Sequence, residues 1–165
     1  MRTHEALLRH FRDLRDGTYG HASSREDKER LFTETVALMD AVARQTLDEV
    51  NAELLLGTGQ VEATGLTRSQ DGGLMAVWSL TWPEQRRAGV EPVALVAHYG
   101  RGFHHPHLRG GTVGEWPLNV FNASDAADQL PTLRAIAAAD VHNLVFQADY
   151  RLIPAVAEEA PPEGR

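Results

Sequence analysis

The sequence contains no cysteine among its 165 residues. This absence excludes a disulfide framework, a thiolate zinc site and a cysteine nucleophile. Nothing else in the composition calls for an oxidising compartment. A chain of this length is expected to form one domain whose core needs no covalent staple.

Long apolar runs and positive charge are also scarce. No window approaches the roughly 18 apolar residues of a membrane span, and the first ten residues lack a signal-peptide core. The chain has 16 Lys and Arg against 23 Asp and Glu, a formal net charge of −7. Neutralising phosphates needs a basic surface, so nucleic-acid binding is not expected. We expect a cytoplasmic protein that binds neither nucleic acid nor membrane.

Histidine, in contrast, is concentrated in one stretch. Residues 98–121 read HYGRGFHHPHLRGGTVGEWPLNVF and hold half of the chain's eight histidines. The same stretch contains five glycines and two prolines. Imidazole side chains therefore gather where the backbone turns most sharply, which indicates a functional site.

The spacing of these histidines is compatible with one metal ion. In an extended segment His105 and His107 leave the same face, with Pro106 between them. His98 would close a preceding strand, and Glu115 follows on the return strand. Imidazole suits Zn, Fe, Cu or Ni, and three nitrogens plus a carboxylate form a common open metal site. We therefore predict a metal-dependent enzyme that acts on a small molecule.

In this hypothesis His98, His105 and His107 are the ligands, with His142 as a reserve ligand. Glu115 is either a fourth ligand or the general base that acts on a bound water. His104 faces away from its neighbours in an extended run and is expected to be solvated or to support the ligands.

Two alternatives stay open for the same residues. Histidines also cluster to satisfy buried turns by hydrogen bonding, which is a structural role. In a metal-free enzyme, a histidine would act as general acid or base on a substrate whose carboxylate is held by Arg101 or Arg109. We favour Arg101 and regard Arg109 as a solvated loop residue.

Helical spacing of apolar residues predicts two N-terminal helices. Thr3 caps a short amphipathic helix that stops near Gly17. Ser23 and Glu26 form a capping box that opens a longer helix. The apolar positions of this helix indicate a core face and not a cofactor site. They are Phe32, Val36, Met39, Ala43, Leu47, Val50 and Leu54.

Segments with strand patterns follow these helices. Residues 60–67 form a weak strand, and residues 74–82 alternate clearly, with Trp78 and Trp82 assigned to the core. A charged loop at 83–89 leads to residues 92–99, which are apolar on both faces. Residues 113–121 form a fourth strand. Two short helices, broken at Pro131, then precede a fifth strand at 142–153.

These elements predict an α+β fold. N-terminal helices, one of them long, pack on an antiparallel sheet of about five strands with a helical insertion before the last strand. Residues 1–154 form the single domain, and residues 155–165 form a disordered tail rich in Pro, Ala and Glu.

The order of three segments resembles the ubiquitin-conjugating (E2) fold. They read DGGLMAVWSLTWP (71–83), EPVALV (91–96) and HPHLRGGTV (105–113), with Trp116 beyond them. That family has a His-Pro-Asn turn followed by a catalytic Cys, but here the Asn is His107 and residues 112–114 hold no Cys. The likeness covers under a third of the chain. It implies a non-catalytic module that binds a protein partner, with the histidine turn serving as structure.

A second resemblance concerns the metal motif alone. The sequence His105-Pro106-His107, followed by Glu115, is similar to the His-x-His and Glu motif of the cupin family. The gap before Glu115 is longer than cupins use, and only His142 could supply the downstream histidine. The likeness implies metal chemistry without implying the cupin fold.

The long helix also predicts a homodimer. Leu31, Leu38 and Val42 make a second apolar seam beside the core face. The N-terminal helix, with Leu7, Phe11 and Leu14, is too short to cover this seam entirely. We therefore expect a two-fold axis near the long helix.

Overall fold

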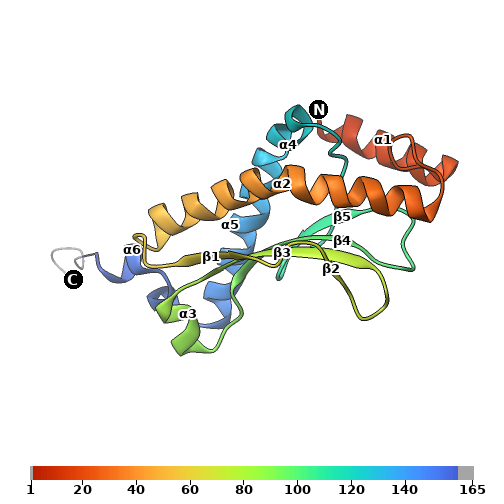
Figure 1. Ribbon diagram of the computed structural model, residues 1–165. Helices are drawn as coiled ribbons and strands as arrows, with labels where there is room; N and C mark the ends of the chain where they lie inside the picture. The colour runs from red at the N-terminus through yellow and green to blue at the C-terminus, as the bar shows by residue number, and fades with distance from the viewer. Residues whose placement is uncertain (1, 160–165) are drawn as a thin grey trace.

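The computed structural model describes residues 2–159 and has the predicted α+β architecture (Figure 1). Helix α1 (Thr3–Asp16) and the 30-residue helix α2 (Arg25–Leu54) come first. An antiparallel sheet of six strands follows, and α4 (Ala123–Asp128) and α5 (Leu130–Gln147) come after it. The strands are β1 (Gln60–Ala63), β2 (Thr67–Arg68), β3 (Leu74–Thr81), β4 (Val93–Tyr99), β5 (His107–Gly110) and β6 (Trp116–Pro117).

The sheet has the order β1-β3-β4-β5-β6, and β2 also pairs with β3. Strand β3 buries every second residue, and β4 is buried at most positions, as expected for the centre of a sheet. Helices α2 and α5 contact each other and also contact β3 and β4, respectively. They therefore cover one face of the sheet. The core between them contains Phe32, Met39, Leu47, Trp78, Trp82, Leu95, Leu133 and Leu144.

Helix α2 confirms the predicted core stripe, because Phe32, Met39 and Leu47 are fully buried. Its N-cap differs from the prediction by one residue: the Ser24 hydroxyl accepts the backbone N–H of Asp27. Trp78 and Trp82 are core residues, as predicted, and their indole N–H groups bond Asp40 and the carbonyl of Leu152.

The predicted fifth strand is wrong. Residues 130–147 form one helix, α5, followed by the 3-10 turn η1 (Tyr150–Leu152) and the short α6 (Pro154–Ala157). Pro131 lies in the first turn of α5, where no backbone N–H is needed, so the chain breaks before this proline and continues after it. Leu133, Ala137, Val141 and Leu144 keep helical spacing, whereas Phe146, a key residue of the strand pattern, is 80% exposed.

Three smaller expectations also need correction. The charged loop contains a helix, α3 (Pro83–Ala88), which begins with proline and ends at Gly89 in a left-handed conformation. Of residues 113–121 only Trp116–Pro117 pair as a strand, while β5 forms earlier at His107–Gly110. Residues 155–157 of the expected tail belong to the helix α6, and residues 160–165 lie outside the described part.

The second apolar seam of α2 is covered within the chain. Leu38 and Val42 are half-buried and pack against the core, and α2 contacts both α4 and α5. The open seam that motivated a homodimer is therefore not found in the described residues, and dimerisation stays a prediction. None of the helices in residues 2–159 is long and apolar enough to cross a membrane.

Helix α1 differs from α2 in the side that it buries. Leu8, Phe11 and Leu14 on its apolar side are 51%, 55% and 46% exposed. Its inward side carries His10, which is 7% exposed, and Asp13, which bonds a histidine of the β4–β5 segment, beside the half-buried Leu7. This inverted packing brings two titratable residues of α1 to the histidine-rich stretch.

Candidate functional site: a histidine cluster and a basic pocket

Strand pairing brings His98 and His107 together. They are direct partners in the β4–β5 register, and their rings are stacked with centroids 6.1 Å apart. Both alternate with core residues, so they lie on the sheet face that α2 and α5 leave open. The predicted convergence of these two histidines is therefore found in the structure.

Glu115 bonds His98. Its Oε2 lies 2.8 Å from His98 Nε2, while the side chains of His98 and Glu115 are 16% and 49% exposed, respectively. The carboxylate orients the imidazole through Nε2. The other ring nitrogen, Nδ1, is not engaged by Glu115. The exposed Phe103 packs against His98, with the two ring centroids 6.0 Å apart.

His105 is buried and has both ring nitrogens engaged. Nδ1 donates to the Pro106 carbonyl at 2.9 Å, and Nε2 lies 3.1 Å from Asp13 Oδ2. A carbonyl oxygen can only accept, so Nδ1 is the donor to Pro106, and Nε2 faces the Asp13 carboxylate. His105 therefore serves as a buried link between α1 and the sheet. It could not ligate a metal without losing one of these bonds.

His10 of α1 completes the histidine cluster, which we define as His10, His98, His105 and His107 with Asp13 and Glu115. The His10 ring lies 4.5 Å from His105 and 5.0 Å from His107. Burial, followed by the neighbouring His105 and His107, lowers the pKa of His10 to about 4. Its Nδ1 is buried and has no hydrogen-bond partner among the described residues.

The pKa of His107 is also lowered, which favours its neutral form. Its Nδ1 donates to the His105 carbonyl at 2.9 Å, and burial is the main cause that lowers its pKa. In residues 2–159 no group of three or more His, Asp or Glu side chains has the geometry to hold a metal ion. A metal at this cluster would therefore require some of the rings to reorient.

The reserve ligand lies elsewhere. His142 is an exposed residue of α5, where its ring packs against Phe146 and its Nδ1 is 3.2 Å from the Asn143 amide oxygen. No ring contact joins it to the histidine cluster in the described part of the chain. His104 is exposed, as expected for a histidine that faces away from its neighbours.

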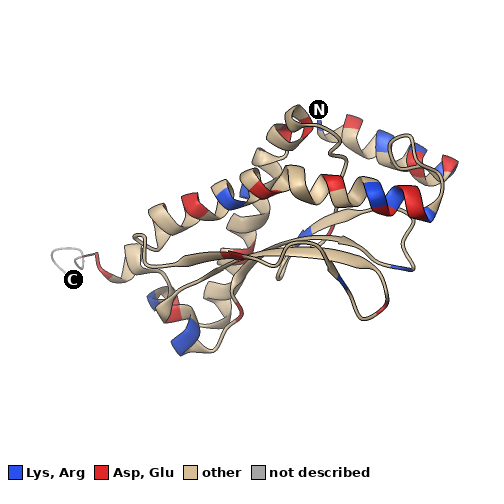
Figure 2. Cartoon of the chain, in the orientation of Figure 1, with Lys and Arg blue, Asp and Glu red and all other residues tan. Residues whose placement is uncertain are grey.

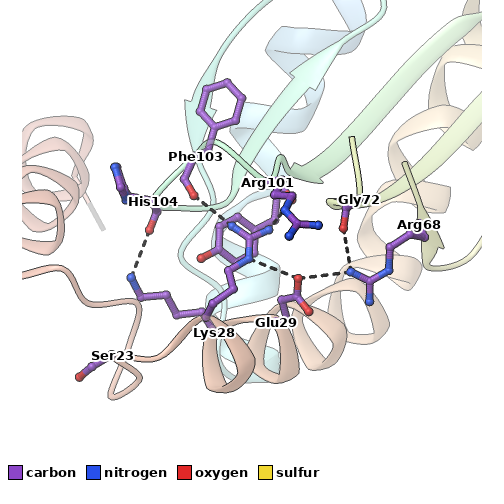
Figure 3. A pocket seen from close by; sticks show the side chains of 10 residues that line it. Ser23, Lys28, Glu29, Arg68, Gly72, Arg101, Phe103 and His104 are labelled. Carbon is purple, nitrogen blue, oxygen red and sulfur yellow. Dashed lines mark hydrogen bonds and ion pairs between the residues drawn. The ribbon is translucent and has the colours of Figure 1, made fainter. Parts of the chain in front are cut away.

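A basic pocket of about 540 Å³ lies beside the histidine stretch. Its walls come from the start of α2, the β2–β3 turn and the β4–β5 loop (Figure 3). Four cationic residues line it with a single carboxylate, although the chain as a whole is acidic. Figure 2 shows that charged residues of both signs are frequent on α1 and α2 and sparse on the sheet. The cationic residues are Arg25, Lys28, Arg68 and Arg101, and the carboxylate is Glu29.

Two of the four cations are engaged within the protein. Arg25 stacks on Tyr99 at 3.5 Å and donates to the carbonyls of Tyr99, Gly100 and Phe103. Arg68 donates to the Gly72 carbonyl at 2.8 Å. Both arginines also share Glu29 Oε1, at 3.3 and 3.4 Å. These two residues build the pocket wall.

Lys28 and Arg101 retain unused donors. Lys28 is 6% exposed, and its ammonium makes one long contact, 3.5 Å to the His104 carbonyl. Burial, and then the nearby Arg25, lower the pKa of Lys28. The Arg101 guanidinium lies over Gly72 and makes no hydrogen bond or ion pair with the described residues. The predicted carboxylate-binding residue Arg101 thus lines a pocket, whereas Arg109 bonds the carbonyl of Gly110 outside it.

The loops that carry Arg101 and Gly72 are joined by Asp71. Its carboxylate accepts the Ser69 hydroxyl and the backbone N–H groups of Gly73 and Arg101. The Ser69 hydroxyl, and then the two backbone donors, lower the pKa of Asp71 to about 2. Gly72 has a φ of +87°, and a side chain there would contact the Arg101 guanidinium at 3.0 Å. The turn is thus built to leave room for Arg101.

The comparisons with known proteins do not supply a family. No family model matches the sequence, and neither a curated protein nor a solved structure gives a significant match. The resemblances to the E2 fold and to the cupin motif therefore stay hypotheses.

Proposed function

We propose that the protein binds a small anionic molecule in the basic pocket. The observation that carries this proposal is the pair of cations with unused donors, Lys28 and Arg101, on the wall of a 540 Å³ cavity. Ligand pockets of small molecules commonly have a volume of roughly 300–1,000 Å³ with a few convergent polar groups. Guanidinium and ammonium groups form charge-assisted hydrogen bonds with carboxylates and phosphates.

The burial of Lys28 supports a ligand of this charge. A largely buried ammonium with one long hydrogen bond is unfavourable, because the Asp13 carboxylate offsets only part of the effect of desolvation and of the nearby Arg25. An anion beside Lys28 would supply these partners and offset the repulsion from Arg25. Such a site also fits an enzyme in which Arg101 holds the carboxylate of a substrate.

Calorimetric titration at fixed ionic strength tests the proposal, with acetate, succinate and inorganic phosphate as probes. We expect Arg101→Gln to weaken binding of the best probe roughly tenfold or more, because one charge-assisted contact is lost. Arg109→Gln removes the same charge outside the pocket and should leave the affinity unchanged. Absence of binding by any of these anions up to roughly 10 mM would contradict the proposal.

A second candidate is a metal-dependent enzyme built on the histidine cluster. The unpartnered, buried Nδ1 of His10 beside His107 favours it, because an imidazole nitrogen without a hydrogen bond is available as a ligand. His98, His107 and Glu115 would join this ligand set after reorientation, and the roles predicted for His105 and His142 stay hypotheses. The metal would activate a bound water, and Glu115 would accept its proton.

Metal analysis of untagged protein tests this candidate. Bound Zn, Fe, Cu or Ni should disappear in His107→Ala and persist in the matched variant His142→Ala. Wild-type protein that contains none of these metals after growth with all four would refute it. The third reading, a non-catalytic protein-binding module, requires that His105→Ala lower stability without abolishing partner binding.

A further inference from the structure

The two ends of the basic pocket carry different free cations. Lys28 lies on the His104 side, where its ammonium meets the His104 carbonyl. Arg101 lies on the Gly72 side, next to the turn that also carries Arg68. Figure 3 shows the Lys28 side chain running from α2 to the His104 carbonyl, while Arg101 comes from the β4–β5 loop and lies near Gly72.

The α2 wall of the pocket also carries a negative group. Glu29 lies on α2 between the labelled Lys28 and Arg68 in Figure 3. Only one of its two carboxylate oxygens is shared by Arg25 and Arg68, through contacts of 3.3 and 3.4 Å. The second carboxylate oxygen makes no hydrogen bond or ion pair with the described residues, so it would repel an anionic group placed beside it.

We propose that the ligand is a dicarboxylate whose two carboxylates bind Lys28 and Arg101 and whose uncharged chain passes Glu29. This inference rests on the proposed function and adds the ligand class to it. A single anionic group satisfies one cation and leaves the other without a partner. Two linked groups satisfy both, and the second contact forms within the complex at a high effective concentration. Arg101 is suited to one end because its planar fork matches a carboxylate.

The walls of the pocket are prepared for a ligand of this kind. Asp71 ties the β2–β3 turn to the β4–β5 loop, and Arg25 ties that loop to α2. Binding at Lys28 and Arg101 therefore joins segments that are already held in place. Little ordering cost opposes the ligand, which favours a measurable affinity for a small molecule.

Titration with dicarboxylates of increasing chain length tests the inference, alongside the monocarboxylate of each length, inorganic phosphate and pyrophosphate. We expect one or two dicarboxylates to bind roughly tenfold or more tightly than the matched monocarboxylates. Arg101→Gln and Lys28→Met should each reduce the best dicarboxylate to the level of its monocarboxylate. The double variant should lose little more, because either single change already removes the bridge.

The possible results separate the inference from the proposed function. If monocarboxylates bind as tightly as dicarboxylates, or if phosphate or pyrophosphate binds more tightly than both, the dicarboxylate assignment is overturned while anion binding stands. If no anion binds, both fail. Lys28→Arg keeps the charge and should keep the preference for dicarboxylates. Because Lys28 is buried, its variants are first checked by thermal unfolding to establish that they fold. If they do not fold, the variant of the exposed Arg101 tests the dicarboxylate assignment.

Discussion

The histidine cluster and the basic pocket lie side by side but use their polar groups in opposite ways. In the cluster, His98 pairs with Glu115, His105 with Asp13, and His107 with a backbone carbonyl, while His10 alone keeps a buried, unpartnered ring nitrogen among the described residues. In the pocket, Lys28 and Arg101 keep donors that no described residue accepts. Burial alone therefore does not mark the binding site, because His105 is more buried than either cation.

This difference predicts different consequences of mutation. Removing a member of the cluster should cost stability, because its partner is left buried and unpaired. Removing Lys28 or Arg101, the two cations of the pocket with unused donors, should cost binding and little stability. The most direct test of this difference is to measure the free energy of unfolding and the anion affinity for variants of each region.

The largest effect is expected for His105→Ala. The substitution leaves Asp13 and the Pro106 carbonyl without their partner and creates a cavity beside Tyr19. We expect a loss of about 3 kcal/mol in the free energy of unfolding, measured by urea denaturation at pH 7. His104→Ala, one residue earlier and exposed, is the matched control and should change it by less than about 0.5 kcal/mol. Equal losses in both variants would show that His105 is not a structural link.

The pH dependence of stability is expected to be the second largest effect. His10 faces His105, His107 and Asp13, and its pKa is about 4 in the folded protein against 6.5 for the free side chain. Between these values the unfolded chain binds a proton that the folded protein excludes, so stability falls as pH decreases from 6.5 towards 4. The loss is at most about 3 kcal/mol, and solvent contact reduces it.

Replacement of His10 isolates this contribution. Urea denaturation at several pH values should show a shallower decline between pH 6.5 and 4 in His10→Phe than in the wild type. His142→Phe changes an exposed histidine and should leave the slope unaltered. An identical decline in His10→Phe would refute the role of His10.

A smaller effect of opposite sign is expected for Lys28→Met. The substitution removes a buried ammonium that makes one long hydrogen bond and keeps an unbranched side chain that is one atom shorter. We expect the protein to be stabilised by up to about 1 kcal/mol while it loses anion affinity, a common trade-off at binding sites. Thermal unfolding and titration on the same sample measure both. A clear loss of stability would move Lys28 to the structural group.

The smallest effect on stability is expected for Arg101→Gln. The side chain is exposed and makes no ion pair with a described residue, so the free energy of unfolding should change by less than about 0.5 kcal/mol. Arg25→Gln is the contrast within the same pocket, since Arg25 binds three carbonyls and Tyr99. We expect Arg25→Gln to be destabilising. Similar stability of the two variants would contradict the assignment of Arg25 to the wall.

Elements with a strong local pattern were predicted correctly from the sequence. The apolar residues of α2 lie on one side only if the segment is a helix, and those of β3 only if it is a strand. Each pattern therefore requires one structure. Residues 142–147 were predicted wrongly because their pattern fits a strand and a helix alike, and packing of α5 on α2 and β4 decides between them. Short apolar runs are ambiguous for this reason.

The candidate site was predicted in part. The spacing of His98, His105 and His107 in the turn-rich stretch predicted that they converge on one site. Ring contacts join His98 to His107 and His107 to His105, and their role as a site stays a prediction. His10 and Asp13 were missed because they lie on a distant helix whose apolar side seemed to be the packing side. The one available signal was that both fall on the same face of α1, three residues apart. Of the residues that line the basic pocket, only Arg101 was predicted to bind a ligand.

The sequence by itself determined the α+β composition, the core faces of α2 and β3, and the gathering of histidines at a sharply turned segment. These follow from period, turn chemistry and charge, which act over a few residues. The tertiary structure decided that α1 packs with its polar side inward, that His105 pairs with Asp13, and that residues from α2, the β2–β3 turn and the β4–β5 loop enclose one pocket. Such contacts join residues up to 92 positions apart. Their partners are selected by the packing of whole elements, which no local pattern specifies.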